Sequence, residues 1–180
     1  KLQVGNVYLK VLAERARAQA KNAETLFDKG VDLGALQGVP IALKDLLDTK
    51  NDVTGSGSKV LAAEKAATRD ATLVQQLDKA GAVFLGKTNM TELAFSGIGM
   101  NPHFGTPGCA LDKTRIPGGS SSGSAVAVAE NLACAAIGSD TGGSVRIPAS
   151  FNSLVGLKTT NGDLSTEGCI PLSTTLDTLG

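Results

Sequence analysis

Two segments rich in glycine and serine carry most of the side chains in this chain that could do chemistry. The first reads P-G-G-S-S-S-G-S-A over 117–125, and the second reads G-S-D-T-G-G-S-V-R over 138–146. Glycine tolerates positive φ and lets backbones approach closely, so such loops can aim several N–H groups at one point. A flexible linker has a similar composition, but these segments flank a nearly continuous Ala/Val/Leu run, which indicates folded structure. The candidate nucleophiles and proton carriers are Ser120, Ser121, Ser122 and Ser144.

A lysine stands at the end of an apolar run elsewhere in the chain. Lys44 directly follows V-P-I-A-L at 39–43, which is typical of a short buried strand. Such a lysine is either the solvated end of the strand or a buried amine. Because lysines are rarely fully buried, the strand alone favours the solvated alternative. A buried amine would tend to lose its charge and could then act as a base.

Strands alternating with helices predict an α/β layered fold with a largely parallel sheet. No internal repeat and no separate domain boundary is visible. Asp70 is a candidate cap for one helix, and Thr88 or Asn89 for another that has Glu92 in its first turn. Helices are expected over 7–27, 68–80, 88–95 and 122–132, and strands over 39–43, 82–85 and 133–137, with loops over 30–38, 49–59 and 96–116.

One segment fits the phosphate-binding P-loop pattern, namely G-A-V-F-L-G-K-T at 81–88. A P-loop needs its strand before the first glycine and a flexible loop between the two glycines. Here the residues between the glycines are themselves the expected strand. The position of this strand therefore argues against nucleotide binding by the segment 81–88.

Two other short patterns match known nucleophile motifs. The segment G-S-S-S-G at 119–123 fits the nucleophile elbow of α/β-hydrolases, which needs a later histidine, whereas the single histidine, His103, precedes it. A His–Asp–Ser order through His103, Asp112 or Asp140, and Ser144 stays open, since triads occur in several orders. Ser-x-x-Lys at 56–59 lacks the supporting motifs of penicillin-binding enzymes.

The composition excludes several classes of protein. Lys plus Arg and Asp plus Glu are equal at 17 each, so no basic surface for nucleic acid or membrane is indicated. No apolar run approaches the roughly 20 residues of a membrane span, and no signal-peptide pattern opens the chain. Three widely spaced cysteines favour reduced thiols in a cytoplasm, and no metal-site spacing is present.

Several long motifs in one order closely resemble those of the amidase signature family of amide hydrolases, from about Gly38 to Gly180. The chain departs from the usual family pattern at Ser122, Asn152-Ser153 and Thr159. Family members are more than twice this long, which agrees with ends that look cut, at Lys1 and Gly180. The matching segments are G-V-P-I-A-L-K-D (38–45), G-K-T-N-M-T-E (86–92), P-G-G-S-S-S-G-S-A (117–125), G-S-D-T-G-G-S-V-R-I-P-A (138–149) and L-V-G-L-K (154–158).

The resemblance implies the amidase signature fold for 1–180, a mixed, largely parallel β-sheet with α-helices on both sides, of which this chain holds the amino-terminal portion. It implies a Ser–cisSer–Lys triad of Ser144, Ser120 and Lys44, in which the peptide bond before Ser120 is cis. A neutral lysine would draw a proton through Ser120, and Ser144 would attack the amide carbonyl. The further site residues that it implies are Thr141, Gly142 and Gly143 in the oxyanion hole, Phe95, Ser96 and Ser121 near the substrate, and a polar pair of Asp140 and Arg146 that braces the second loop.

The activity that the resemblance implies is hydrolysis of a small carboxamide to a carboxylate and ammonia or an amine, through a serine acyl-enzyme. It implies no cofactor and no metal, a cytoplasmic location, no direct contact with nucleic acid or membrane, and a homodimer. An alternative is the amidase subunit of a glutamyl-tRNA amidotransferase, which passes the ammonia to a partner that handles tRNA. A non-catalytic binding protein on the same fold is a third alternative, which the intact triad disfavours. The substrate itself is not readable from these residues.

Overall fold

A four-stranded mixed sheet forms the centre of the molecule in the computed structural model, which describes residues 4–180. Its order is β1-β3-β2-β4, in which β2 runs parallel to both β3 and β4 and β1 is antiparallel to β3. Nearly every residue of β2 and β3 is buried, as expected for parallel strands covered on both faces. The largely parallel sheet predicted from the sequence is therefore confirmed. The strands are β1 (Tyr8–Val11), β2 (Pro40–Lys44), β3 (Val83–Thr88) and β4 (Ala135–Ile137).

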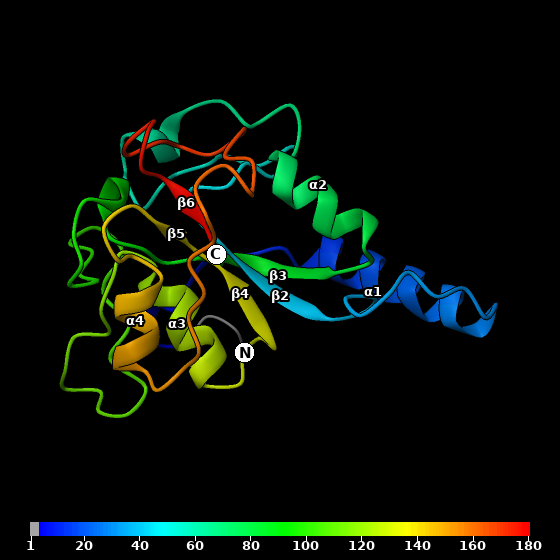
Figure 1. Ribbon diagram of the computed structural model, residues 1–180, viewed down its shortest axis with the longest axis horizontal. Helices are drawn as coiled ribbons and strands as arrows, with labels where there is room; N and C mark the ends of the chain where they lie inside the picture. Colours follow the sequence, from blue (N-terminus) through cyan, green and yellow to red (C-terminus); the bar gives the residue numbers. More distant parts are fainter. Residues whose placement is uncertain (1–3) are drawn as a thin grey trace.

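Helices cover both faces of this sheet (Figure 1). On one face, α2 (Thr72–Lys79) packs through Val74 against Phe84 of β3, and α1 (Ala13–Asp28) places Arg15 over the Phe84 ring. On the other face, α3 (Ser122–Ala129) buries Val126 and Ala127 against the sheet, with α4 (Arg146–Phe151) beside it. Two apolar cores result, one on each face. Short 3-10 turns lie at Val4–Asn6, Leu61–Ala63 and Glu92–Ala94.

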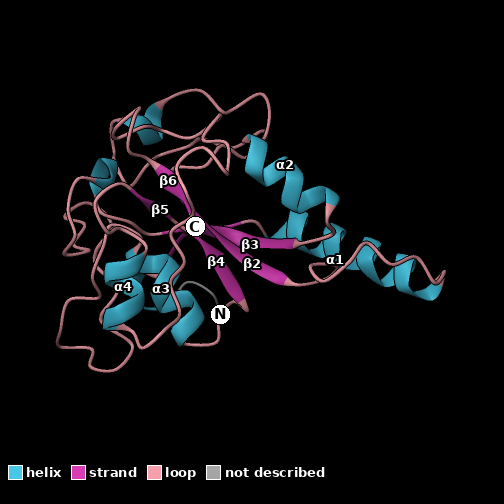
Figure 2. Cartoon of the chain, viewed as in Figure 1, coloured by secondary structure: helices cyan, strands magenta, loops and turns pink. Residues whose placement is uncertain are grey.

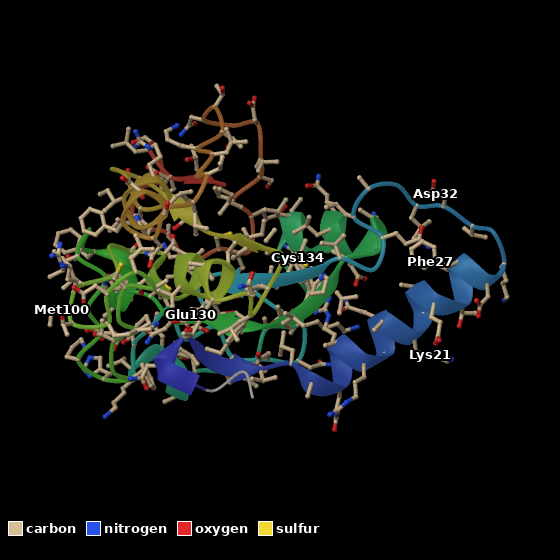
Figure 3. All side chains as sticks on the ribbon, turned by 90° about the horizontal axis from the view of Figure 1, so that it is seen from below. Lys21, Phe27, Asp32, Met100, Glu130 and Cys134 are labelled. Atoms are coloured by element: carbon tan, nitrogen blue, oxygen red, sulfur yellow. The ribbon has the colours of Figure 1, made fainter. Side chains whose placement is uncertain are left out.

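The helix predicted over 7–27 is wrong in its first part. Tyr8–Val11 form β1 and pair with β3, and the helix begins only at Ala13. Valine and tyrosine favour extended backbone, and here they gain a neighbouring strand to pair with, which the local pattern does not display. The last turn of α1 projects away from the sheet, and Phe27 on it lies at the opposite end of the molecule from Met100 (Figure 3).

The helix predicted over 88–95 is also wrong. Thr88 ends β3, and only Glu92–Ala94 form a single 3-10 turn, in which Leu93 and Ala94 both have positive φ. Positive φ in two successive residues is incompatible with an α-helix. Asn89, expected as a cap, instead donates from Nδ2 to the carbonyls of Asn6 and Gly105. Tertiary hydrogen bonds thus take the polar groups that the prediction assigned to capping.

The other elements agree with the prediction apart from their ends. The helix expected over 68–80 begins at Thr72, and Asp70 does not cap it but accepts two hydrogen bonds from Arg15. The helix expected over 122–132 ends at Ala129, and the following strand begins at Ala135. The sequence did not predict α4 or the small antiparallel pair of β5 (Ser139–Asp140) and β6 (Thr178–Leu179).

The carboxyl ends of the three parallel strands meet at one edge of the sheet, beside the β5–β6 pair (Figure 2). Lys44 ends β2 and Thr88 ends β3, while β4 leads through Gly138 into β5. The loop before α3 and the loop after β5 also converge here, since the Ser121 N–H donates to the Ser144 carbonyl. In open α/β sheets, ligands bind outside the carboxyl ends of the strands. A binding or catalytic site is therefore expected at this edge.

Candidate active site

Lys44 is fully buried at the carboxyl end of β2. Its side chain has 0% exposure, so the solvated alternative that the strand pattern favoured is wrong. The Nζ lies 2.7 Å from Ser120 Oγ and 2.8 Å from Ser139 Oγ. An ammonium donates to both hydroxyls, whereas a neutral amine has a lone pair that can accept a proton from one of them. The amine thus has two hydroxyl partners from two loops.

The environment of Lys44 disfavours its charge. Burial lowers the pKa of Lys44 from 10.5 to about 7, although the negative charges of Asp140 and Asp177 act in the opposite direction. Removing an ammonium from water is costly, and no carboxylate lies close enough to form a salt bridge with this amine among the described residues. At neutral pH, a large fraction of the molecules therefore carries an uncharged amine at this position.

The first Gly/Ser loop brings Ser120 to this amine. The peptide bond between Gly119 and Ser120 is cis, in agreement with the family resemblance. The loop is held on both sides, because the Gly119 N–H donates to Gly97 O at 2.8 Å and the Ser120 carbonyl accepts from the Thr91 N–H at 3.1 Å. Ser120 is completely buried. Its hydroxyl is fixed beside Lys44 rather than free on a mobile loop.

The second loop carries Ser144 and lies against the first. The Ser144 carbonyl accepts from the Ser121 N–H at 3.1 Å. Ser144 is therefore hydrogen-bonded to the residue that directly follows Ser120 in the chain. Ser144 is 8% exposed, which leaves it some access to solvent. Ser121 also ties the loops through its side chain, since its Oγ donates to the Ser139 carbonyl and accepts from the Ser139 N–H.

Asp140 braces the second loop, and the expected pair with Arg146 is confirmed. The guanidinium donates from Nε and Nη2 at 3.0 Å each, and backbone N–H groups of Gly143, Val145 and Arg146 donate to the same carboxylate. Burial opposes the charge of Asp140, but these hydrogen bonds outweigh it and lower its pKa to about 2. The carboxylate therefore fixes the turn that carries Ser144.

The residues expected to form an oxyanion hole lie on this turn. Gly142 is exposed, and a Cβ built on it would meet no atom within 4 Å, so the space beside its Cα is open. Gly143 has a φ of +127°, which favours glycine. However, the Gly143 N–H, expected in the hole, donates to Asp140 Oδ1 at 2.7 Å. Thr141 is anchored by its hydroxyl, which donates to Asp177.

Ser139 is the residue in this cluster that the sequence interpretation missed. Its hydroxyl is as close to the Lys44 amine as that of Ser120, and it is 6% exposed. The only signal in the sequence is its place between Gly138 and Asp140 in a motif already singled out. That signal does not tell which serine of the motif faces the lysine, because the contact joins residues 95 positions apart.

Phe95 and Ser96, expected near the substrate, lie beside the site rather than at the amine. Phe95 is 79% exposed and lines a surface pocket of about 550 Å³ together with Met100 and Leu172. The Ser96 carbonyl accepts from Thr91 Oγ1 at 3.3 Å. Thr91 also lines this pocket, and its N–H donates to the Ser120 carbonyl, so the pocket adjoins the first Gly/Ser loop.

The P-loop pattern and the histidine triad do not form sites. Gly86 and Lys87 of the P-loop pattern lie inside β3, so no phosphate-binding loop exists there. The nearest acid to His103 is Glu92, at 3.0 Å from its Nε2. The two acids considered for a histidine triad are used elsewhere, Asp112 by Arg115 and Asp140 by Arg146.

Side chains that could bind a metal do not gather within residues 4–180. No group of three or more His, Cys, Asp and Glu side chains there could hold a metal ion. None of the helices in the same range is long and apolar enough to cross a membrane.

Asn152, one of the departures from the family pattern, is buried and donates from Nδ2 to the carbonyls of Pro117 and Pro148, which ties the first loop to α4.

Comparison with known proteins identifies the family of this chain. The family model described as Amidase matches residues 3–180. The A subunit of the glutamyl-tRNA(Gln) amidotransferase of Koribacter versatilis is 47% identical over 97% of this chain and 36% of its own length, and that of Chlorobium limicola is 45% identical over 97% and 37%. The chain thus spans little more than a third of the length of these relatives.

Solved structures agree with the sequence comparison. The native peptide amidase from Stenotrophomonas maltophilia superposes with a TM-score of 0.91 at 39% identity, over 98% of this chain and 37% of that one. A chain from a vestigial complex connected with the origins of an s-triazine catabolic enzyme superposes with a TM-score of 0.96 at 41% identity, over 98% and 39%. The chain therefore belongs to the amidase family.

Proposed function

We propose that the full-length protein hydrolyses the C–N bond of a carboxamide through an acyl-enzyme on Ser144, with Ser120 as proton relay and Lys44 as base. The single observation that supports this most is the Lys44 amine, fully buried and 2.7 Å from Ser120 Oγ. Its pKa of about 7 makes the neutral, basic form available near neutral pH. A serine hydroxyl needs such a base before it can attack a carbonyl.

The steps of acylation follow from this arrangement. Neutral Lys44 accepts the Ser120 proton while Ser120 accepts the Ser144 proton, and the Ser144 oxygen forms a bond to the carbonyl carbon. The tetrahedral intermediate then breaks its C–N bond. The proton held on Lys44 returns through Ser120 to the leaving nitrogen, which departs as ammonia or an amine. Water, activated by the same base, releases the carboxylate and restores Ser144.

The oxyanion of this intermediate needs donors fixed before the reaction. In the proposal, the backbone N–H groups of Thr141, Gly142 and Ser144 supply them, each worth ~3 kcal/mol in the transition state. Gly143 contributes the sharp turn, because its own N–H already donates to Asp140. Asp140 accepts hydrogen bonds from the Val145 N–H and from Arg146 Nε, which supports a turn that is already fixed before the reaction. Such a turn does not need to reorganise when negative charge develops on the substrate oxygen.

The proposal assigns substrate contact to Ser121, Phe95 and Ser96. Ser121 joins the two loops, and the pocket lined by Phe95 lies next to them and offers apolar surface to an acyl group. The test is ammonia release by the full-length protein from a panel of aliphatic, aryl and urea-like amides, with Lys44→Ala as the comparison. Release by the wild type and its loss in a folded variant are expected. Equal release by both would overturn the proposal.

A second candidate is the amidase subunit of a glutamyl-tRNA amidotransferase, favoured by the 43–47% identity to relatives that carry this name. The chemistry at Ser144 would be the same, but the ammonia would pass to a partner. Ammonia release from a simple amide by the isolated full-length protein, without ATP or tRNA, favours the hydrolase. Release that requires the partner, ATP and tRNA favours the amidotransferase.

The proposed setting of this enzyme is the cytoplasm, with a small amide as substrate. Three free cysteines, of which Cys134 is exposed, fit a reducing compartment. The proposal uses no cofactor and no metal, since the residues named above supply every proton transfer. The homodimer that the family resemblance implies is tested by sedimentation of the full-length protein.

A further inference from the structure

Asp177 joins the turn of Thr141 to a distant part of the chain. Thr141 Oγ1 donates to its Oδ1, and the N–H groups of Leu172 and Ser173 donate to its Oδ2 at 2.8 and 3.0 Å. All of these partners are uncharged. The carboxylate is therefore fixed in place by three neutral donors from two segments.

The neighbouring residue reinforces this connection. Thr178 pairs with Asp140 in the β5–β6 sheet, and its Oγ1 donates to the Asp140 carbonyl at 2.9 Å. The segment 177–178 thus holds the turn at two successive residues. Thr178 contacts the main chain of Asp140, and Asp177 accepts from the side chain of Thr141. A turn fixed at both residues has little freedom to move its next N–H groups.

Asp177 also faces the surroundings of the Lys44 amine. Asp177 and Ser139 line the same pocket of about 130 Å³, and the Ser139 hydroxyl is 2.8 Å from Lys44 Nζ. The other walls of this pocket are mostly apolar, with Leu46, Ile170 and Leu179 among them. A charge acts more strongly across apolar, water-poor surroundings than across bulk water.

We infer that Asp177 is a positioning residue of the proposed amidase site, which holds the Thr141 turn in place and whose negative charge acts on the Lys44 amine across the pocket. This inference rests on the proposed function. Asp140, the other acid that acts on Lys44, is matched by the Arg146 guanidinium, whereas Asp177 has no salt bridge among the described residues. Of the two acids that act on this amine, Asp177 is therefore the one without a salt bridge within residues 4–180.

The sign of the effect on Lys44 follows from the charges that face it. Asp140 and Asp177 both favour the ammonium and so raise its pKa against the larger effect of burial. Removing the charge of Asp177 alone should lower the pKa of Lys44 further. Cys169 lines the same pocket, but burial, with Asp48 and Asp177 adding to it, raises its pKa to about 12, so the thiol stays neutral across the pH range of the experiment.

The experiment measures, in the full-length protein, the rate of labelling by a fluorophosphonate and the kcat for an amide, both as functions of pH. Asp177→Asn removes the charge, and Thr141→Val removes only the hydroxyl bonded to it. Asp163→Asn, an exposed aspartate in the same stretch of chain, is the matched control. Folding of each variant is checked by near-UV circular dichroism.

The two variants are expected to differ in kind. Asp177→Asn should move the acid limb of the pH profile of the labelling rate to lower pH. Thr141→Val should leave this limb in place and lower kcat by about tenfold or more, because an oxyanion donor is misplaced. Asp163→Asn should match the wild type in both. An acid limb that Asp177→Asn leaves unmoved, or that Thr141→Val moves equally, overturns the inference alone. Wild-type protein that the probe does not label overturns the proposed function and this inference with it.

Discussion

The Nζ of Lys44 lies 2.7 Å from the Oγ of Ser120, although 76 positions separate the two residues in the chain. The end of β2 supplies the lysine, and the loop before α3 supplies the serine. Both side chains are fully buried, and the Lys44 amine has Ser139 Oγ as a second hydroxyl partner at 2.8 Å. An amine in such surroundings is more available as a base than a solvated one, since a large fraction of it is unprotonated at neutral pH.

Replacing the proposed nucleophile should abolish catalysis without unfolding the protein. Ser144→Ala removes one oxygen from a side chain whose backbone, not its hydroxyl, holds the loops together. We expect loss of amide hydrolysis and of fluorophosphonate labelling, measured in the full-length protein, with an unchanged melting temperature. Ser150→Ala on the exposed face of α4 is the matched control and should keep full activity. Labelling that survives in Ser144→Ala would assign the nucleophile to another residue.

Removing the second hydroxyl partner of Lys44 should slow the reaction modestly. Ser139→Ala deletes one hydrogen bond to the amine, and a bond of this kind contributes about 0.5–1.5 kcal/mol. We therefore expect kcat to fall about two- to tenfold, since 1.4 kcal/mol corresponds to about a factor of ten. Ser139→Thr keeps the hydroxyl and should restore most of the rate. If Ser139→Thr is as slow as Ser139→Ala, the effect comes from packing and not from the hydrogen bond.

The Asp140 carboxylate should stabilise the fold in a way that depends on pH. Its pKa is about 2 in the folded protein, below the usual 3.8, so its contribution is complete above pH 4 and is lost as the pH falls toward 2. A shift of this size corresponds to about 2 kcal/mol. Urea unfolding of Asp140→Asn should show a deficit of this order at pH 7 that shrinks at pH 3. A deficit of equal size at both pH values would mean that geometry, not charge, is responsible.

A second buried lysine, Lys87, should matter for stability rather than for catalysis. Its side chain has 0% exposure, donates to the Leu47 carbonyl and lies 3.9 Å from Asp45 Oδ1. Burial lowers the pKa of Lys87 and raises the pKa of Asp45, so each group depends on the other for its charge. Removing one partner of a buried pair costs about 3–5 kcal/mol.

The corresponding measurement is a double-mutant cycle in chemical denaturation. Lys87→Met should lower the free energy of unfolding strongly, and Lys87→Met with Asp45→Asn should recover part of the loss, because no unpaired charge remains buried. The free energy of unfolding that the double variant recovers, relative to Lys87→Met alone, measures the coupling of the two side chains. A double variant that is less stable than either single variant would show that the two side chains do not act as a pair.

The sequence was sufficient for the elements whose pattern is local. The apolar run at 39–43 predicts β2, and the Gly/Ser loops with the Ala/Val run between them predict α3 and its flanks. The elements it misassigned depend on distant partners. Tyr8–Val11 becomes a strand because β3 lies beside it, and Asn89 leaves its expected capping role because the carbonyls of Asn6 and Gly105 take its amide.

The same distinction holds for the site. Family motifs indicate Lys44, Ser120 and Ser144, and the structure puts Ser120 at hydrogen-bonding distance from the lysine. Neither the burial of Lys44 nor the part played by Ser139 could be predicted from the residues alone. Both depend on how the loops after β4 and before α3 close over the end of β2, which involves contacts more than 70 positions apart.

The charge on Lys44 can be measured directly by nuclear magnetic resonance titration of the full-length protein with isotope-labelled lysines, with Lys44→Arg to assign the signal. The buried amine should titrate near pH 7, far below the exposed lysines, because burial lowers its pKa to about that value. A Lys44 signal that titrates with the exposed lysines above pH 10 would contradict the proposal that an uncharged amine serves as the base.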